Sequence, residues 1–225
     1  MQSIGILASN VGYALLYTPW GCGSGMTKNA TDLILRDRLQ FTLDANGSQA
    51  TVYGRFDLSD YTSALERKGL SIKEVQFMVR NPNNLNFSNT GAWFQVGIES
   101  QNGGPTMLES SLKIYATTRA YEAASTVGIA SPDVLCIEQW ESSTGPFDFI
   151  NGLPGNVTLV HNKYGTLDLH PDGFPVVTDL LIGVAADQWQ TVADATLELD
   201  VMIIASPITI SQKQLTEMLV QGQDQ

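Results

Sequence analysis

The chain has few of the residues that enzymes and soft-metal sites use. Its 225 residues include two histidines and two cysteines. No HExxH motif and no paired His/Cys spacing occurs, so the sequence predicts no zinc site. No GxSxG elbow surrounds a serine, and the glycine-rich segment 21–25 lacks the lysine of a phosphate-binding loop. We therefore predict no catalytic residue, no metal ligand and no cofactor.

Basic charge is also scarce. The 12 lysines and arginines are outnumbered by 23 acidic residues, and the formal net charge is −11. Proteins that bind nucleic acid use basic side chains to displace the counterions of phosphate. The composition therefore argues against direct nucleic-acid binding. Because the acidity is spread along the chain, it favours solubility and mutual repulsion of subunits.

Long hydrophobic runs are absent. The segment Ile4–Tyr17 is apolar, but Asn10 and two glycines interrupt it, and it is too short to span a bilayer. It carries no lysine or arginine, which a secretory signal normally has at its start. We expect residues 1–32 to form an N-terminal arm or an extra strand, and the chain to be made in the cytoplasm without a signal peptide.

The chain does have a long series of strand-like segments. In Thr196–Ala205, Leu197, Leu199, Val201 and Ile203 alternate with polar residues, the period of a half-buried strand. The other predicted strands are Leu33–Leu43, Ala50–Asp57, Leu70–Arg80, Trp93–Glu99, Ser111–Thr117, Val134–Glu141, Val157–His161, Gly165–Leu169 and Asp179–Ala186. With no βαβ alternation, these nine or ten strands favour an antiparallel sandwich or barrel.

Turn and cap residues predict the connections. Asn46–Gly47 indicates a type I′ hairpin between the first two strands. Residues 58–69 have the cap and stop signals of a short helix, and a register break predicts a bulge near Lys73–Glu74. A second hairpin is expected around residues 162–164. At the C-terminus, a Ser-x-x-Gln capping box at Ser211 precedes a short amphipathic helix over Gln212–Gln221.

Several residues suggest chemistry that their context does not support. Glu138 and Glu141 flank Trp140, and a carboxylate pair beside aromatics can hydrolyse glycosides. Residues three apart on a strand point to opposite faces, however, so the two carboxylates should not converge. His161 and His170 are interpreted as polar residues at strand ends.

Three further features have more than one interpretation. The segment 168–173 places Asp168, Asp172 and a glycine together, which predicts a turn more strongly than a calcium site. Trp93, Trp140 and Trp189 could line a sugar-binding face, although burial in a core or an interface is commoner for such rings. Cys22 and Cys136 could form one disulfide or remain two free thiols.

The strand pattern resembles the single jelly-roll major capsid proteins of icosahedral viruses, particularly tailless bacterial and archaeal viruses. The segments that carry the likeness are F-T-L-D-A-N-G-S-Q-A-T-V-Y-G-R-F-D-L-S-D-Y, L-S-I-K-E-V-Q-F-M-V-R and A-T-L-E-L-D-V-M-I-I-A. The resemblance implies an all-β antiparallel sandwich of jelly-roll type, with eight or more strands over residues 33–207. Residues 208–225 would form the C-terminal helix and tail.

The same resemblance implies a function. The chain would be a self-assembling, non-catalytic subunit of a virion shell, whose partners are copies of itself and other capsid proteins. The uncharged N-terminal arm would suit contact with an internal membrane, and no small-molecule substrate is expected. The alternatives are a carbohydrate- or cation-binding sandwich module of an appendage or cell-surface protein, and a glycosidase or lyase that uses Glu138 or Glu141.

Overall fold

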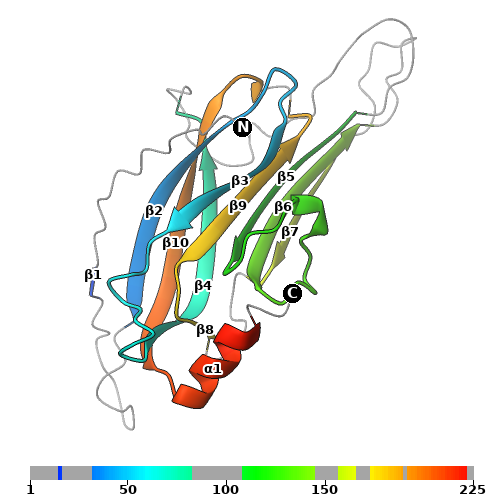
Figure 1. Cartoon of the computed structure of the whole chain (residues 1–225). Helices are drawn as coiled ribbons and strands as arrows, with labels where there is room; N and C mark the ends of the chain where they lie inside the picture. The colour runs from blue at the N-terminus through cyan, green and yellow to red at the C-terminus, as the bar shows by residue number, and fades with distance from the viewer. Residues whose placement is uncertain are drawn as a thin grey trace, which may run out of the picture.

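In the described part of the chain, ten strands form two five-stranded antiparallel sheets that face each other as a sandwich (Figure 1). The computed structural model describes residues 15–16, 32–82, 108–144, 157–165, 173–189 and 192–221. The expected all-β antiparallel sandwich of eight or more strands with a short C-terminal helix is confirmed. The strands predicted over Trp93–Glu99 and Gly165–Leu169 lie outside the described residues, apart from Gly165.

The first sheet, sheet A, has the order β1-β2-β10-β4-β8. Its strands are β1 (Leu15–Leu16), β2 (Leu33–Thr42), β10 (Thr196–Thr209), β4 (Lys68–Arg80) and β8 (Phe174–Val176). The second sheet, sheet B, has the order β3-β9-β5-β6-β7. Its strands are β3 (Gln49–Phe56), β9 (Leu180–Asp187), β5 (Leu108–Thr117), β6 (Val134–Thr144) and β7 (Val157–Tyr164).

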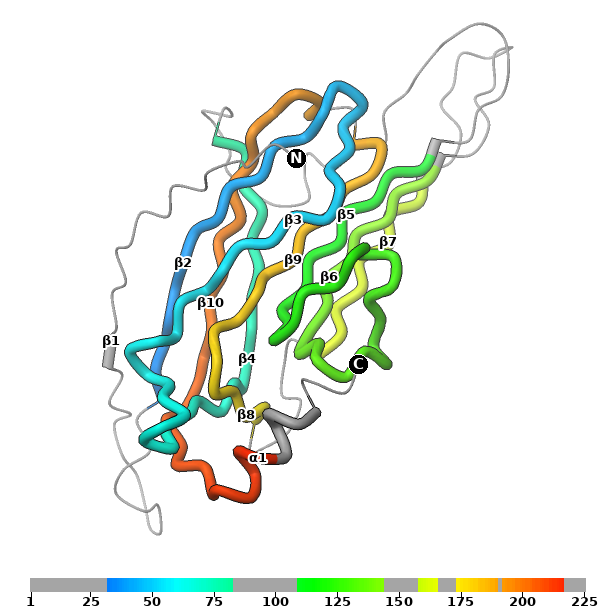
Figure 2. Tube along the Cα trace, in the orientation of Figure 1, coloured from blue at the N-terminus to red at the C-terminus, as the bar shows by residue number. Residues whose placement is uncertain are grey.

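The strand pairs are nested along the chain. Strand β2 pairs with β10, β3 with β9, β4 with β8, and β5 with β6. Consecutive strands β2, β3 and β4 therefore alternate between the sheets, as do β8, β9 and β10 (Figure 2). Successive pairs therefore lie in opposite sheets, and β1 and β7 lie outside this nesting, at the edges of sheets A and B.

Strand β10, at the centre of sheet A, has the two faces that its sequence predicts. Leu197, Leu199, Val201 and Ile203 are buried in the core between the sheets. On the outer face, the Nε atom of Arg38 lies 2.6 Å from an Oδ of Asp200. Because every second residue faces the other sheet, one hydrophobic alternation supplies both the core and a charged exterior.

The turn between β2 and β3 is not the predicted hairpin. Asn46–Gly47 does lie in a tight turn, and the carboxylate of Asp44 accepts a hydrogen bond from the Asn46 backbone. The two strands nevertheless belong to different sheets. The Trp189 backbone N–H donates to the Gly47 carbonyl, which fastens the turn to the β9–β10 connection. The hairpin prediction was wrong because the turn residues specify a bend but do not determine which strand each flanking strand pairs with.

The predicted helix over residues 58–69 is also wrong. Residues 59–61 and 64–67 form turns, Ser63 pairs with Lys68 as an isolated bridge, and Arg67 has a φ of 56°. A segment this short gains little from helical hydrogen bonds alone. Leu58 is fully buried in the core, so the chain is held there and leads through the bridge directly into β4.

The predicted bulge in β4 is confirmed. Ile204 faces Glu74 and Ala205 faces Ile72, which leaves Lys73 as the extra residue. The Lys73 ammonium lies 2.6 Å from a carboxylate oxygen of Asp32. The bulge therefore turns a basic side chain toward an acidic partner without shifting the buried faces on either side.

A loop covers part of the outer face of sheet B and forms a second small core. The loop contains a 3₁₀ turn, η1 (Ala124–Thr126). The hydroxyls of Tyr53 and Tyr115 lie 2.6 Å apart, and the Lys113 ammonium donates to the Ala124 carbonyl. Burial raises the pKa of the Tyr115 hydroxyl and lowers that of the Lys113 ammonium.

The C-terminal helix has the predicted bounds. Helix α1 (Gln212–Gln221) follows β10 at one end of the sandwich (Figure 1). The Gln214 backbone N–H donates to the Ser211 hydroxyl, and the Ser211 backbone N–H donates to the Gln214 side chain. This reciprocal pair is the capping box that the sequence predicts.

Candidate functional site

A buried carboxylate with two basic neighbours lies between β6 and β7. In the register of this pair, Glu138 faces Lys163 and Trp140 faces His161. Across the other edge of β6, Glu138 faces Ile114 and Trp140 faces Leu112, both of which belong to the main core. The period of two therefore places a carboxylate, an ammonium and an imidazole on the inner face of sheet B.

The carboxylate of Glu138 is almost completely buried, with 1 % of the residue exposed. Its Oε1 atom lies 2.8 Å from the Nε2 of His161 and 3.1 Å from the Nζ of Lys163. Its Oε2 atom is also buried and has no hydrogen-bond partner among the described residues. A buried carboxylate is costly unless a cation or hydrogen bonds compensate it, so the Lys163 ammonium and the hydrogen bond with His161 stabilise the Glu138 carboxylate.

His161 has a second contact in the same place. Its ring stacks on the indole of Trp140, with 4.6 Å between the centroids and 10° between the planes. Because the side chains of His161 and Lys163 are 38 % and 44 % exposed, the cluster is open to solvent along β7 and closed at Glu138. We call Glu138, Trp140, His161 and Lys163 the inner-face cluster; it fastens β7 to β6.

The structure corrects the interpretation of His161 as a strand-end residue. Residues 162–164 form no hairpin, because β7 continues through Tyr164 and pairs with β6 without a break. His161 therefore lies in the middle of a strand. The sequence signal that could have located the cluster is a pair of matching alternations, Glu138 and Trp140 on one strand and His161 and Lys163 on the next.

Glu138 and Glu141 do not share a face, as their spacing predicts. Glu138 points into the sandwich, whereas Glu141 is exposed on the outer face opposite Ser111. Glycoside hydrolysis uses two carboxylates on either side of one bond. These two carboxylates are separated by the sheet itself, so they form no such pair.

The tryptophans of the described residues are part of the core. Trp140 and Trp189 are 4 % and 1 % exposed and belong to the main hydrophobic cluster. Burial of this kind leaves no open ring face for a sugar. Trp93, Asp168, His170, Asp172 and Cys22 lie outside the described residues. Gly173, at the end of the predicted turn, has a φ of 71°, a backbone conformation that glycine adopts readily.

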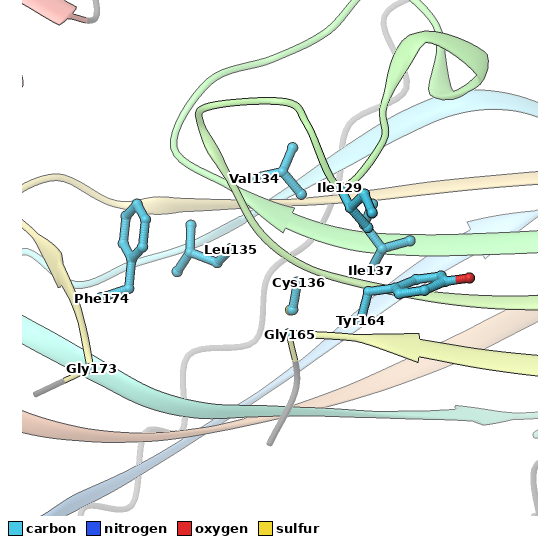
Figure 3. Close-up of a pocket in the computed structure, with 9 residues that line it drawn as sticks. All are labelled: Ile129, Val134, Leu135, Cys136, Ile137, Tyr164, Gly165, Gly173 and Phe174. Carbon is cyan, nitrogen blue, oxygen red and sulfur yellow. The ribbon is translucent and has the colours of Figure 1, made fainter. Parts of the chain in front are cut away.

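A second candidate site is an apolar cavity of about 340 Å³ beside the start of β6 (Figure 3). Side chains of β6, including Cys136, form its floor, and Ile129, Tyr164 and Phe174 lie around it. Cys136 is a free, buried thiol, and burial raises its pKa to about 12. A protonated thiol is a poor nucleophile and metal ligand, so the cavity offers apolar contact and little reactivity.

No protein-family model matches this chain, and no curated protein is significantly similar to it. Among the described residues, no helix is both long enough and apolar enough to span a membrane. In the same residues, no three histidine, cysteine or acidic side chains are grouped closely enough to hold a metal ion.

Proposed function

We propose that the chain is a non-catalytic structural subunit that assembles with copies of itself, and with other capsid proteins, into the shell of a virion. The observation that carries the proposal is the nested pairing of β2 with β10, β3 with β9, β4 with β8, and β5 with β6. Pairing of this kind, in two layers of four strands, is what a jelly roll requires, and viral capsid domains are a common use of that fold.

Jelly rolls also serve as lectins and cupins, so the fold alone does not decide the function. A structural role is supported by the contacts of the side chains that could otherwise take part in catalysis or sugar binding. The carboxylate of Glu138 is engaged by two side chains of the neighbouring strand, and Trp140 and Trp189 fill the core. Each of these residues therefore stabilises the sandwich, and none presents a reactive group to a substrate.

The distribution of charge supports a subunit that leaves the genome to other components. In the described part of the chain, several basic side chains form ion pairs with carboxylates of the chain itself, among them Arg38, Arg55, Lys68, Lys73, Arg80 and Lys163. A side chain that already neutralises a carboxylate displaces few counterions from phosphate. Direct nucleic-acid binding is therefore not part of the proposal.

The two chain ends supply candidate contacts with neighbours. Helix α1 lies beyond the last strand, and Leu15–Leu16 pairs with the outer edge of β2. Closed shells need several self-complementary or head-to-tail contacts on each subunit. We propose that residues 1–32 contribute one of these contacts and that their apolar part can reach an internal membrane.

Light scattering and negative-stain microscopy of the purified chain, over a range of salt and calcium concentrations, test this function. Closed shells or regular sheets are the expected result. A chain without residues 1–22 should keep the circular dichroism of the sandwich and assemble less well. A stable monomer under every condition would contradict the proposal. Calcium-dependent melting or binding on a glycan array would then favour the carbohydrate- or cation-binding alternative.

A further inference from the structure

We propose that β7 is a subunit interface at which two copies of the chain pair their β7 strands antiparallel, continuing sheet B from one copy into the next. Strand β7 is the last strand of sheet B and pairs only with β6 among the described residues (Figure 1). All eight of its residues are in register with β6, without a bulge. Its other edge therefore offers a regular row of backbone donors and acceptors.

The other three edge strands are protected in ways that β7 is not. Strand β1 has two residues, and β8 has three, one of which is Pro175. Strand β3 contains Gly54, and its register with β9 shifts between Gln49 and Val52. Short length, proline and irregular register all hinder edge-to-edge pairing. Strand β7 has no proline, glycine or register shift.

Side chains on both faces of β7 are exposed. Leu159 on the inner face is 50 % exposed, and Val160 and Tyr164 on the outer face are 39 % and 42 % exposed. These are three of the six large hydrophobic side chains exposed in the described part of the chain. A strand with exposed apolar side chains on both faces and one open edge gains buried apolar area when a partner strand pairs with that edge.

An inward-pointing lysine often protects an edge strand, because pairing would bury its charge. Lys163 has that position, but Glu138 already compensates it from the neighbouring strand. His161 is likewise held by Glu138 and by the ring of Trp140. The inner-face cluster therefore removes the usual electrostatic obstacle and holds β7 against β6.

A second copy of the chain suits this edge better than an unrelated peptide, and this choice of partner rests on the proposed function. The net charge of −11 makes most faces of two copies repel, but β7 contains no acidic residue. A two-fold axis perpendicular to the sheet would place like faces together, so Leu159 would meet the inner face of the partner strand and Val160 its outer face.

Cysteine cross-linking of the full chain tests this arrangement. In a Cys22→Ser background, cysteine is placed singly at Leu159, Val160, His161 and Asn162. Residues nearest the two-fold axis face their own copies with Cα atoms about 4.5–5.5 Å apart, which suits a disulfide. One of the four variants should therefore cross-link far more than its neighbours under mild oxidation. Equal cross-linking of all four, or none, would overturn the proposal.

The matched control is Glu141→Cys. Glu141 is exposed beside Val160 on β6, one strand further from the edge. In the proposed dimer the two copies of this residue would be about three strand spacings apart, which is too far for a disulfide. Cross-linking of Glu141→Cys as strong as that of the best β7 variant would indicate random collision and would overturn the proposal.

A charge substitution gives an independent readout. Val160→Lys places two lysines at the interface and should weaken self-association by more than about tenfold. Gln139→Lys, on the same face of β6, makes the same change in charge and should leave self-association unchanged. If particles form but the β7 variants do not cross-link, the capsid function stands and this interface is wrong. If the β7 variants cross-link into dimers that never assemble further, the interface stands and the capsid function is wrong.

Discussion

Gly183 of β9 lies directly opposite Tyr115 of β5, on the outer face of sheet B. A Cβ atom at Gly183 would overlap the phenol ring, 2.7 Å from its hydroxyl oxygen. Tyr115 is fully buried there, under the loop that carries η1. The glycine therefore makes room for the ring that joins this loop to the sheet.

The first prediction is that Gly183→Ala destabilises the protein by about 1–3 kcal/mol, because the added methyl group overpacks the second core. The measurement is the free energy of unfolding in urea. Gly128→Ala is the control, since a Cβ atom there meets nothing within 4 Å. It should change the stability by less than about 0.5 kcal/mol. Equal effects of the two substitutions would mean that the Tyr115 ring moves aside easily.

The second prediction concerns the two faces of β10. Val201→Asp puts an unpaired charge between the sheets, where Val201 is 1 % exposed, and should cost at least about 4 kcal/mol. Met202→Asp places the same charge on the outer face, opposite Arg36, and should leave a cooperative thermal transition. A soluble Val201→Asp protein that melts cooperatively would show that the faces of this strand are reversed.

Features encoded by neighbouring residues were predicted well from the sequence. The alternation in β10, the bulge at Lys73 and the capping box of α1 each depend on a few adjacent residues, and all three are confirmed. The connection at Asn46–Gly47 was predicted as a bend, which is correct, and as a hairpin, which is wrong. Which strands pair depends on burial over the whole core, and the sequence of a single turn does not specify it.

The inner-face cluster could not be predicted from neighbouring residues either. Glu138 and His161 are 23 residues apart and meet only because β6 and β7 pair in one particular register. Asn162 and Lys163 resemble turn residues in isolation, so the sequence suggested a break at the place where β7 continues. The argument that Glu138 and Glu141 lie on opposite faces succeeded because it needed only the period of a single strand.

The third prediction tests what Glu138 contributes. Glu138→Gln removes the ion pair with Lys163 and alters the hydrogen bond with His161, and it should destabilise the protein by about 1–3 kcal/mol. Amide hydrogen exchange along β7 should become faster, because the strand loses a fastening to β6. Glu141→Gln, on the exposed outer face, is the control and should change stability by less than about 0.5 kcal/mol. Unchanged exchange in β7 with Glu138→Gln would show that backbone pairing alone holds the strand.

The fourth prediction follows from the buried thiol of Cys136. Its pKa is raised to about 12 by burial, whereas a thiol in the unfolded chain has a pKa of about 8.5. Above that pH the unfolded state binds fewer protons than the folded state, so the free energy of unfolding falls as pH rises, by up to about 1.4 kcal/mol per pH unit.

The comparison that isolates Cys136 is between Cys22→Ser and Cys22→Ser/Cys136→Ala, with urea unfolding measured from about pH 8 to about pH 10.5. Tyrosines and lysines titrate equally in both proteins, so their contributions cancel. The protein that keeps Cys136 should lose stability more steeply with pH, and its thiol should react with a disulfide reagent only through unfolding. Parallel stability curves would mean that solvent reaches the thiol, through the adjoining cavity, in the folded state.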